Sequence, residues 1–258
     1  MKNLISILLI LIIASCKKEE FSQNLTKEFS MHSSEAGADY TIQVALPENY
    51  TPGSQKYKTL YVLDGKENFN FVAERVSKAS NDVMVVAIGY GNDRSFDYTP
   101  TKASEGGGGA ENFMRFIGNE LIPRMEKEYS ADTIRKSRII LGHSFGGLLG
   151  AYAFTNHNHV FGNYILLSPS IWYDNEIMLR LEGENRDVNK NNHQLVFMGI
   201  GELENSGRMQ APYQAFYQRL QSNYPGIQIK SHMEPRLDHR GSENPNIIEG
   251  LDFYFQNR

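Results

Sequence analysis

The feature that most constrains the fold is a regular alternation of short apolar segments with longer segments of helical spacing. Residues 58–63, 83–89 and 137–142 are compact and almost continuously apolar. Runs of this kind are typical of strands that are covered on both faces. Strands that alternate with helices predict a mostly parallel sheet with helices on both sides, which is an α/β fold.

The other elements follow from the same two periodicities. Residues 26–50 alternate in the manner of strands, which predicts an opening antiparallel hairpin. We expect helices at 68–80, 111–129, 145–156, 209–222 and 247–255, and further strands at 164–168, 194–200 and 227–233. The glycine run 106–109 lacks the Lys-Ser/Thr that follows a phosphate-binding loop, so we expect a mobile loop before a helix.

The N-terminus has the features of a secretory signal. Lys2 precedes an apolar run from Leu4 to Ala14, which is too short for a typical membrane span. Small residues then lead to Cys16, and this pattern resembles the lipobox of bacterial lipoproteins, in which the cysteine becomes the lipidated first residue. The alternative is an uncleaved apolar N-terminus with an incidental cysteine.

This resemblance divides the chain into three parts. Residues 1–16 are the expected lipoprotein signal peptide, residues 17–25 a tether, and residues 26–258 a single domain without internal repeats. A lipid-anchored protein of this kind lies in the cell envelope, on the periplasmic side or at the outer-membrane surface. Cys16 is the only cysteine, so an internal disulfide cannot form.

The net charge of the chain limits the classes of partner that it is expected to bind. A formal net charge of −4 over 258 residues provides no basic field for a nucleic-acid backbone. The sequence contains no cluster of His, Cys and carboxylate residues that suggests a metal site. Small-molecule or carbohydrate chemistry without a cofactor is therefore the expectation, and the sequence leaves the oligomeric state open.

One short motif carries the chemistry. Residues 142–146 read GHSFG, which matches G-x-S-x-G, and they lie between an expected strand and an expected helix. In this context the serine occupies a strained turn that exposes its hydroxyl, and flanking glycines relieve the crowding of the strand against the helix. Ser144 is therefore the candidate nucleophile.

A serine nucleophile needs a base and an acid that orients it. Of the seven histidines, only His239 lies after the last expected strand and before the last helix, where this arrangement places its base. The loop after strand 194–200 contains Glu202 and Glu204. The spacing favours Glu204 as the acid, with Glu202 as the competitor, and a Ser–His dyad without an acid is a third possibility. His143 is expected to pack rather than to react.

Acyl transfer also requires hydrogen-bond donors for the developing oxyanion. The amide of Phe145, directly after the nucleophile, is one expected donor. The second is expected from the loop after strand 58–63, where Gly65 permits a close backbone approach. Asp64 is expected to brace this loop.

With these residues placed, the chain resembles the Putative esterase family of α/β hydrolases, close to its esterase D and ferric-siderophore esterase members. The resemblance covers the domain and rests on LYVLDG at 60–65, RSFDYTP at 94–100, GGGGAENFMRFIGNELIP at 106–123, LGHSFGGL at 141–148, LSPSIWYDN at 167–175, GELEN at 201–205 and DHRGS at 238–242. It implies an α/β-hydrolase fold and a substrate pocket bordered by Arg94, Asp97, Ser170 and Trp172.

The resemblance also implies the activity, a serine carboxylic-ester hydrolase that acts through an acyl-enzyme. Siderophore-type esters, such as a catecholate trilactone, are the first expectation for its small-molecule substrate. The alternatives are feruloyl or acetyl esters of carbohydrates, acyl transfer to another hydroxyl, and a non-catalytic lipoprotein that binds a siderophore or glycan. Arg240, beside the expected base, is a departure from the commoner GHGS form, and it either binds an anionic substrate or faces solvent.

Overall fold

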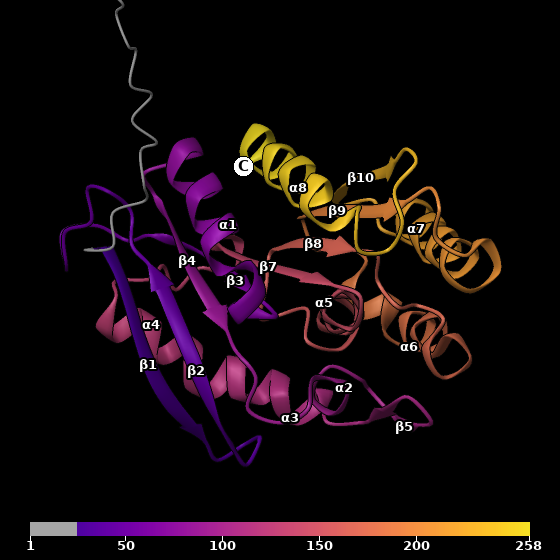
Figure 1. Cartoon of the computed structure of the whole chain (residues 1–258), viewed down its shortest axis with the longest axis horizontal. Coiled ribbons are helices and arrows are strands. Elements are labelled where there is room, and N and C mark those ends of the chain that lie inside the picture. Colours follow the sequence, from indigo (N-terminus) through magenta and orange to yellow (C-terminus); the bar gives the residue numbers. More distant parts are fainter. Residues whose placement is uncertain (1–24) are drawn as a thin grey trace, which may run out of the picture.

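Eight strands form one twisted sheet in the order β1-β2-β4-β3-β7-β8-β9-β10 (Figure 1). This computed structural model describes residues 25–258; the expected signal peptide with Cys16 and all but the last residue of the tether lie outside them. The strands are β1 (Thr26–Ser33), β2 (Ala38–Ala45), β3 (Lys58–Val62), β4 (Val83–Ile88), β7 (Arg138–His143), β8 (Asn163–Leu167), β9 (Gln194–Gly201) and β10 (Ile227–Glu234).

The pairing of the strands follows their connections. The pairs β1–β2 and β2–β4 are antiparallel, which confirms the opening hairpin. All other pairs, from β4–β3 to β9–β10, are parallel. The sheet is therefore mostly parallel, as the alternation of strands and helices predicts.

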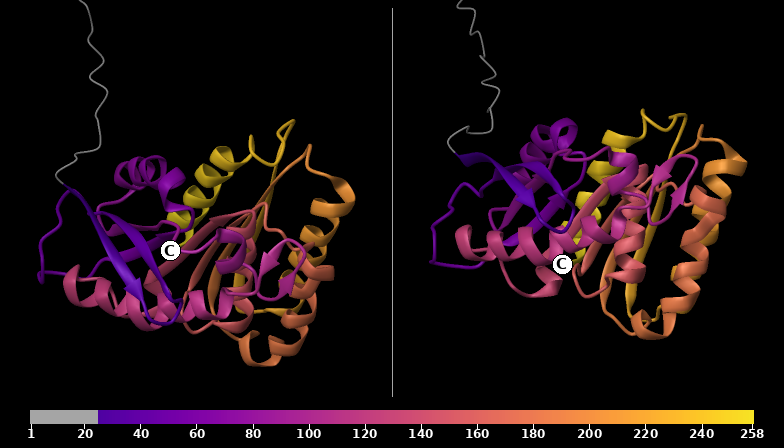
Figure 2. Two further views of the ribbon diagram at one scale, coloured as in Figure 1. Left: turned by 60° about the horizontal axis from the view of Figure 1, so that its bottom comes forward. Right: turned by 90° about the horizontal axis from the view of Figure 1, so that it is seen from below.

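Helices connect the parallel strands. They are α1 (Gly65–Ala79), α2 (Arg94–Asp97), α3 (Ala110–Arg115), α4 (Ile122–Glu128), α5 (Phe145–Asn156), α6 (Tyr173–Asn189), α7 (Ala211–Asn223) and α8 (Glu243–Asn257). The helices α1 and α8 cover one face of the sheet, and α3 to α7 cover the other (Figure 2). Within residues 25–258, none of the helices is both long and apolar enough to cross a membrane.

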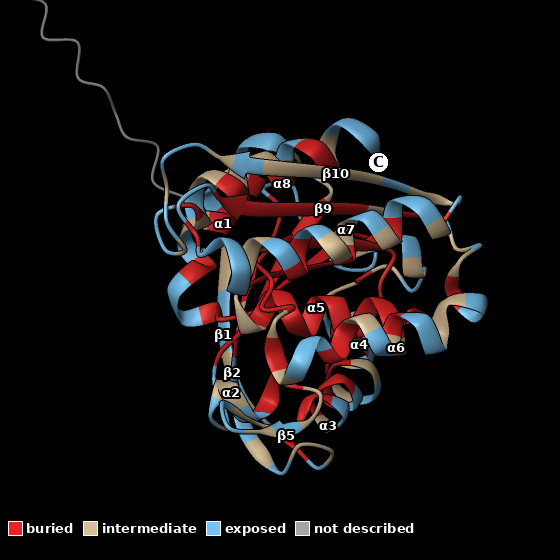
Figure 3. Ribbon diagram, turned by 90° about the vertical axis from the view of Figure 1, so that its right-hand side faces the viewer, coloured by how far each residue is buried: buried red, intermediate tan, exposed pale blue. Residues whose placement is uncertain are grey.

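Two hydrophobic cores result from this arrangement because successive strand residues point to opposite faces. In β3, Leu60 and Val62 pack with α1 and α8, whereas Tyr61 joins the core on the other face. The strand β9 and the helix α5 are almost entirely buried (Figure 3). The strand β7 is also buried except at its first residue. The two elements that flank the candidate nucleophile, β7 and α5, therefore lie in the buried part of the molecule.

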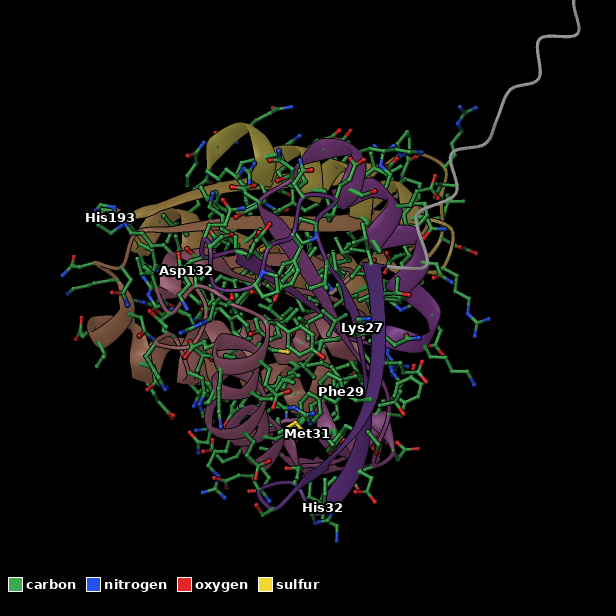
Figure 4. The ribbon with its side chains drawn as sticks, turned by 90° about the vertical axis from the view of Figure 1, so that its left-hand side faces the viewer. Lys27, Phe29, Met31, His32, Asp132 and His193 are labelled. Atoms are coloured by element: carbon green, nitrogen blue, oxygen red, sulfur yellow. The ribbon has the colours of Figure 1, made fainter. Side chains whose placement is uncertain are left out.

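The edge strand β1 is only half covered. Figure 4 shows its side chains, of which Lys27 and His32 are exposed while Phe29 and Met31 are partly buried. The ring of Phe29 stacks on Tyr129, with centroids 6.2 Å apart. This packing ties the opening hairpin to the helical layer.

Three segments differ from the sequence-based expectations. Helix α6 was not predicted, because its buried face includes the polar residues Glu182 and Asn189, which interrupt the apolar periodicity. The expected helix 111–129 is instead α3, a π-helical segment at Phe116–Leu121 and α4. The glycine run precedes a helix as expected, but residues 106–107 pair with 102–103 as a two-residue hairpin rather than forming a loop without structure.

Candidate active site

Ser144 occupies a strained turn between β7 and α5. Its φ and ψ are 60° and −117°, a conformation that costs energy for a residue with a side chain. Its amide donates to the carbonyl of Leu167 at 2.9 Å, and its own carbonyl accepts from the amide of Ser170 at 3.2 Å. A Cβ on Gly142 would lie 2.5 Å from the backbone of Gly146. The glycines therefore allow the close crossing that the sequence motif predicts.

The structure brings His239 and Glu204 together. Nδ1 of His239 lies 2.8 Å from Oε2 of Glu204. The Glu204 side chain is fully buried, whereas the imidazole remains 37% exposed. Glu202 instead accepts the amide of Arg236 at 2.7 Å and points away from this pair. Of the two glutamates, Glu204 is the one that can orient the imidazole.

Two further donors fix the buried carboxylate. Oε1 of Glu204 accepts the hydroxyl of Ser168 at 2.6 Å and the amide of Gly201 at 2.8 Å. Burial by itself would raise the pKa of Glu204, but the hydrogen bonds from His239, Ser168 and Gly201 outweigh it and lower the pKa. The carboxylate is therefore held in its ionised form. Sequence reasoning missed Ser168, and its position directly after β8 was the available signal.

His143 is more than a packing residue. Its Nε2 lies 2.8 Å from the carbonyl oxygen of His239, and the two rings are 4.5 Å apart. Burial, followed by the nearby charge of His239, lowers the pKa of His143 to about 4. A neutral His143 can donate Nε2–H to that carbonyl and fix the backbone that carries the candidate base.

A pocket of about 500 Å³ contains the reactive side chains. Ser144 and His239 both line it, together with Arg240, which borders the pocket and is exposed to solvent. The other lining residues come from α1, the turns after β3 and β4, α2, β7 and α8: Asp64, Glu67, Asn68, Tyr90, Arg94, His143 and Glu243. Sequence reasoning did not single out Glu67, Asn68, Tyr90 or Glu243, because their roles depend on how α1 and α8 meet.

The two expected oxyanion donors begin two helices. Phe145 is the first residue of α5 and Gly65 the first residue of α1, where backbone N–H groups have no acceptor within the helix. A Cβ on Gly65 would lie 2.8 Å from the amide nitrogen of Ile88, so a larger residue does not fit. Asp64 adjoins α5, since its Oδ2 lies 3.3 Å from the Cβ position of Gly146.

Arg94 anchors the turn between β3 and α1. Its guanidinium makes two hydrogen bonds to the carboxylate of Asp64, at 2.8 and 2.9 Å, and a third to the carbonyl of His143 at 3.3 Å. Burial opposes the charge of Arg94, but the hydrogen bonds and the charge of Asp64 raise its pKa. Asp64 therefore braces the loop, as expected.

Three of the residues expected to border the pocket lie elsewhere. The expectation that Asp97 borders the pocket is wrong. Asp97 is buried, and its carboxylate accepts hydrogen bonds from the hydroxyl of Tyr40 at 2.8 Å and from Asn92 at 3.1 Å, so it braces a loop. Ser170 is buried behind Ser144. Trp172 is partly exposed and packs against Phe145, with ring centroids 6.1 Å apart, outside the lining of the pocket.

Comparison with known proteins identifies the family to which the chain belongs. Residues 33–237 match the model of the family described as "Putative esterase". A siderophore triacetylfusarinine C esterase of Aspergillus fumigatus is 33% identical over 162 residues, and this match spans only 55% of either chain. Ferri-bacillibactin esterase BesA of Bacillus subtilis is 29% identical over 220 residues, which are 74% of this chain and 75% of that protein.

A solved structure agrees with these matches. The crystal structure of the BES protein from Bacillus cereus is similar with a TM-score of 0.79 and 28% sequence identity, covering 92% of this chain and 97% of that one. The family model spans most of the sheet and the strand–turn–helix that carries Ser144. This chain therefore belongs to the Putative esterase family and has the α/β-hydrolase fold.

Proposed function

We propose that this protein hydrolyses carboxylic esters through an acyl-enzyme on Ser144. The Ser144 hydroxyl oxygen attacks the ester carbonyl carbon while Nε2 of His239 takes its proton. The amides of Phe145 and Gly65 hold the oxyanion of the tetrahedral intermediate. His239 then returns the proton to the leaving alcohol. A water molecule, deprotonated by His239, attacks the acyl-enzyme and releases the acid.

The observation that carries this proposal is the hydrogen bond between the buried Glu204 and His239, whose imidazole lines the same pocket as Ser144. Glu204 is ionised, and its hydrogen bond to Nδ1 selects the tautomer in which Nε2 is free to accept a proton. The same carboxylate stabilises the imidazolium that forms during the attack. These are the features that turn a weakly nucleophilic hydroxyl into a reactive one.

For the natural substrate we propose a siderophore-type ester, such as a catecholate trilactone. Two relatives are named as esterases of siderophores, triacetylfusarinine C and ferri-bacillibactin. The pocket is open, and the exposed Arg240 borders it, whereas Arg94 in its wall is already paired with Asp64. Guanidinium groups favour anionic or oxygen-rich ligands, which is consistent with such a substrate.

The direct test is hydrolysis of p-nitrophenyl acetate and butyrate by residues 25–258, beside the Ser144→Ala variant. We expect turnover that depends on Ser144 and covalent labelling of Ser144 by a fluorophosphonate. If Ser144→Ala retains the wild-type rate, the mechanism is wrong. Product analysis with catecholate trilactones, feruloyl esters and acetylated sugars then identifies the substrate, and added alcohols reveal any acyl transfer.

We also propose that lipidation of Cys16 anchors the protein in the cell envelope. The support is the signal-like sequence ahead of this cysteine. Several acyl chains on one residue hold a protein at a membrane far more firmly than one chain does. Globomycin, which blocks lipoprotein signal peptidase, should make an unprocessed precursor accumulate. Normal processing in its presence would refute the anchor.

A further inference from the structure

A tryptophan and an arginine lie together beside the candidate active site, outside its pocket. The guanidinium carbon of Arg208 is 3.8 Å from the ring centroid of Trp172. Trp172 also packs against Phe145, the residue that follows the nucleophile, with ring centroids 6.1 Å apart. The three side chains therefore form a continuous surface that leads away from Ser144.

Both residues are fixed by parts of the candidate catalytic machinery. Trp172 lies two residues after Ser170, whose amide donates to the carbonyl of Ser144. Arg208 lies four residues after Glu204. Its backbone amide donates a hydrogen bond to the side-chain oxygen of Asn205 at 2.7 Å. The segment that carries Arg208 is also tied to the acid loop, because Gln210 donates to the carbonyl of Glu204 at 3.0 Å. Arg208 is thus held in place relative to the acid and the nucleophile.

The charge of Arg208 is uncompensated. Three arginines on the neighbouring helices, Arg180, Arg186 and Arg219, each pair with a glutamate. Arg208 is exposed, and within residues 25–258 its guanidinium has no carboxylate partner, only the face of Trp172. Stacking on an aromatic ring aligns a guanidinium and leaves its N–H donors free for an anion.

The position of the proton donor assigns this surface to the acyl group of the ester rather than to its alcohol. His239 must protonate the leaving alcohol, so the alcohol lies in the pocket that Ser144 and His239 share. The acyl part of the ester then extends away from His239, past Phe145, which follows Ser144 directly. The ring centroid of Phe145 lies 5.8 Å from the guanidinium carbon of Arg94 at the pocket and 6.1 Å from the ring centroid of Trp172, so an acyl group that extends past Phe145 reaches Trp172 next.

We propose that Trp172 and Arg208 form a subsite for the acyl group, specific for an acyl group with an apolar body and an anionic far end. Phe145 and Trp172 contact the apolar body, and Arg208 pairs with the anion. This subsite rests on the proposed esterase function and adds a substrate preference to it. It uses a cation different from Arg94 and Arg240, which line the pocket of the alcohol.

The kinetic test compares two esters of nearly the same shape, p-nitrophenyl 4-methylbenzoate and mono-p-nitrophenyl terephthalate. We expect the wild type to prefer the terephthalate in kcat/KM. Arg208→Met keeps the apolar stem and should lower this preference about fivefold, the effect of one exposed ion pair, while Arg208→Glu should lower it further. Arg180→Met, on the exposed face of α6, is the matched control and should leave the ratio as in the wild type.

A binding test is independent of turnover, because Trp172 is the only tryptophan of the chain. In the Ser144→Ala variant, its fluorescence should respond to the methylamides of the same two acids. We expect the carboxylate-bearing amide to bind more tightly, and Arg208→Met to raise its Kd about fivefold. An unchanged ester preference in Arg208→Met, or a fluorescence that responds to neither amide, would overturn the subsite. If the Ser144→Ala variant binds the carboxylate-bearing amide tightly but the wild type hydrolyses no ester, the subsite stands and the proposed function is wrong.

Discussion

Glu204 is the residue on which the candidate site depends most. A fully buried carboxylate is unstable in its charged form unless hydrogen bonds replace the lost water. Here Ser168, Gly201 and His239 donate to it. The charge is therefore stabilised by fixed donors, and it remains available to balance the imidazolium that forms on His239.

The acid can be identified by comparing two glutamates. Glu204→Gln should reduce kcat/KM on p-nitrophenyl butyrate by about 100-fold or more, because an amide cannot stabilise the imidazolium. Glu202→Gln is the matched control and should change it by less than about threefold, since Glu202 is exposed and its carboxylate bonds only the Arg236 amide among the described residues. The reverse ranking would assign the role to Glu202, and full activity in both variants would indicate a Ser–His dyad.

His143 should make the stability of the protein depend on pH. Its folded-state pKa is about 4, against an ordinary value of 6.5. Between these values the unfolded chain binds the proton first, so its contribution to stability is lost as the pH falls from about 6.5 towards 4. His143→Gln keeps a donor for the His239 carbonyl but does not titrate.

Urea unfolding at pH 7 and pH 4.5 measures this effect. The loss of unfolding free energy between the two pH values should be about 2 kcal/mol smaller in His143→Gln than in the wild type. The expected kcat/KM of the variant at pH 8 is close to that of the wild type, because Gln can make the same hydrogen bond. Equal pH dependence in the two proteins would show that His143 is not held neutral by burial.

At the residue scale, the sequence allowed the nucleophile, base and acid to be predicted, because each follows a different strand and their order along the chain is informative. Ser144, Glu204 and His239 do lie together in the structure. The supporting contacts were not predictable in the same way. Ser168 and Glu204 are 36 residues apart, and nothing in either local sequence encodes their hydrogen bond.

At the scale of elements, the crossing of β7 and α5 sets the geometry of the nucleophile. All residues of α5 except the first and the last, Phe145 and Asn156, are buried, so the turn between the two elements has little freedom to relax. Gly142 and Gly146 meet at this crossing, and the backbone of Gly146 leaves no room for a side chain at position 142.

A pair of glycine substitutions tests this requirement. Gly142→Ala should lower the free energy of unfolding by about 2 kcal/mol or more and abolish most turnover, because its Cβ overlaps rigid backbone. Gly183→Ala is the control, since it lies in an exposed turn of α6 with no atom closer than 4.0 Å to the new Cβ. Alanine there should stabilise the protein by about 0.5–1 kcal/mol. Thermal and urea unfolding measure both, and a tolerated Gly142→Ala would contradict the role of the crossing.

The elements differed in how well the sequence predicted them. The strands β4, β7 and β8 are buried throughout or nearly so, and their apolar runs gave their positions within one or two residues. Helix α6 escaped because its buried positions include Glu182, which pairs with Arg186 and Arg219. A buried carboxylate, paired with two partly exposed arginines, takes the place of an apolar residue that would otherwise mark the inner face, so periodicity alone does not find such a helix.

At the scale of the whole molecule, the candidate site lies where the parallel strands end. Ser144, Ser168, Glu204 and His239 follow β7, β8, β9 and β10, which are neighbours in the sheet. Parallel strands bring their carboxyl ends to one edge, and open α/β sheets bind their ligands there. This explains why Ser144 and His239, which are 95 positions apart in the chain, line one pocket.

The same organisation separates catalysis from the proposed membrane anchor. Every residue assigned to the site lies within residues 25–258, whereas Cys16 lies outside them. Cys16→Ala should therefore move the protein from the membrane fraction to the soluble fraction, because each buried methylene of an acyl chain contributes about 0.8 kcal/mol to membrane binding. Its kcat/KM on p-nitrophenyl butyrate should stay within about twofold of the wild type. Cells grown with labelled palmitate test the anchor: label in the wild type but not in the variant supports it, and a wild-type protein that takes up no label refutes it.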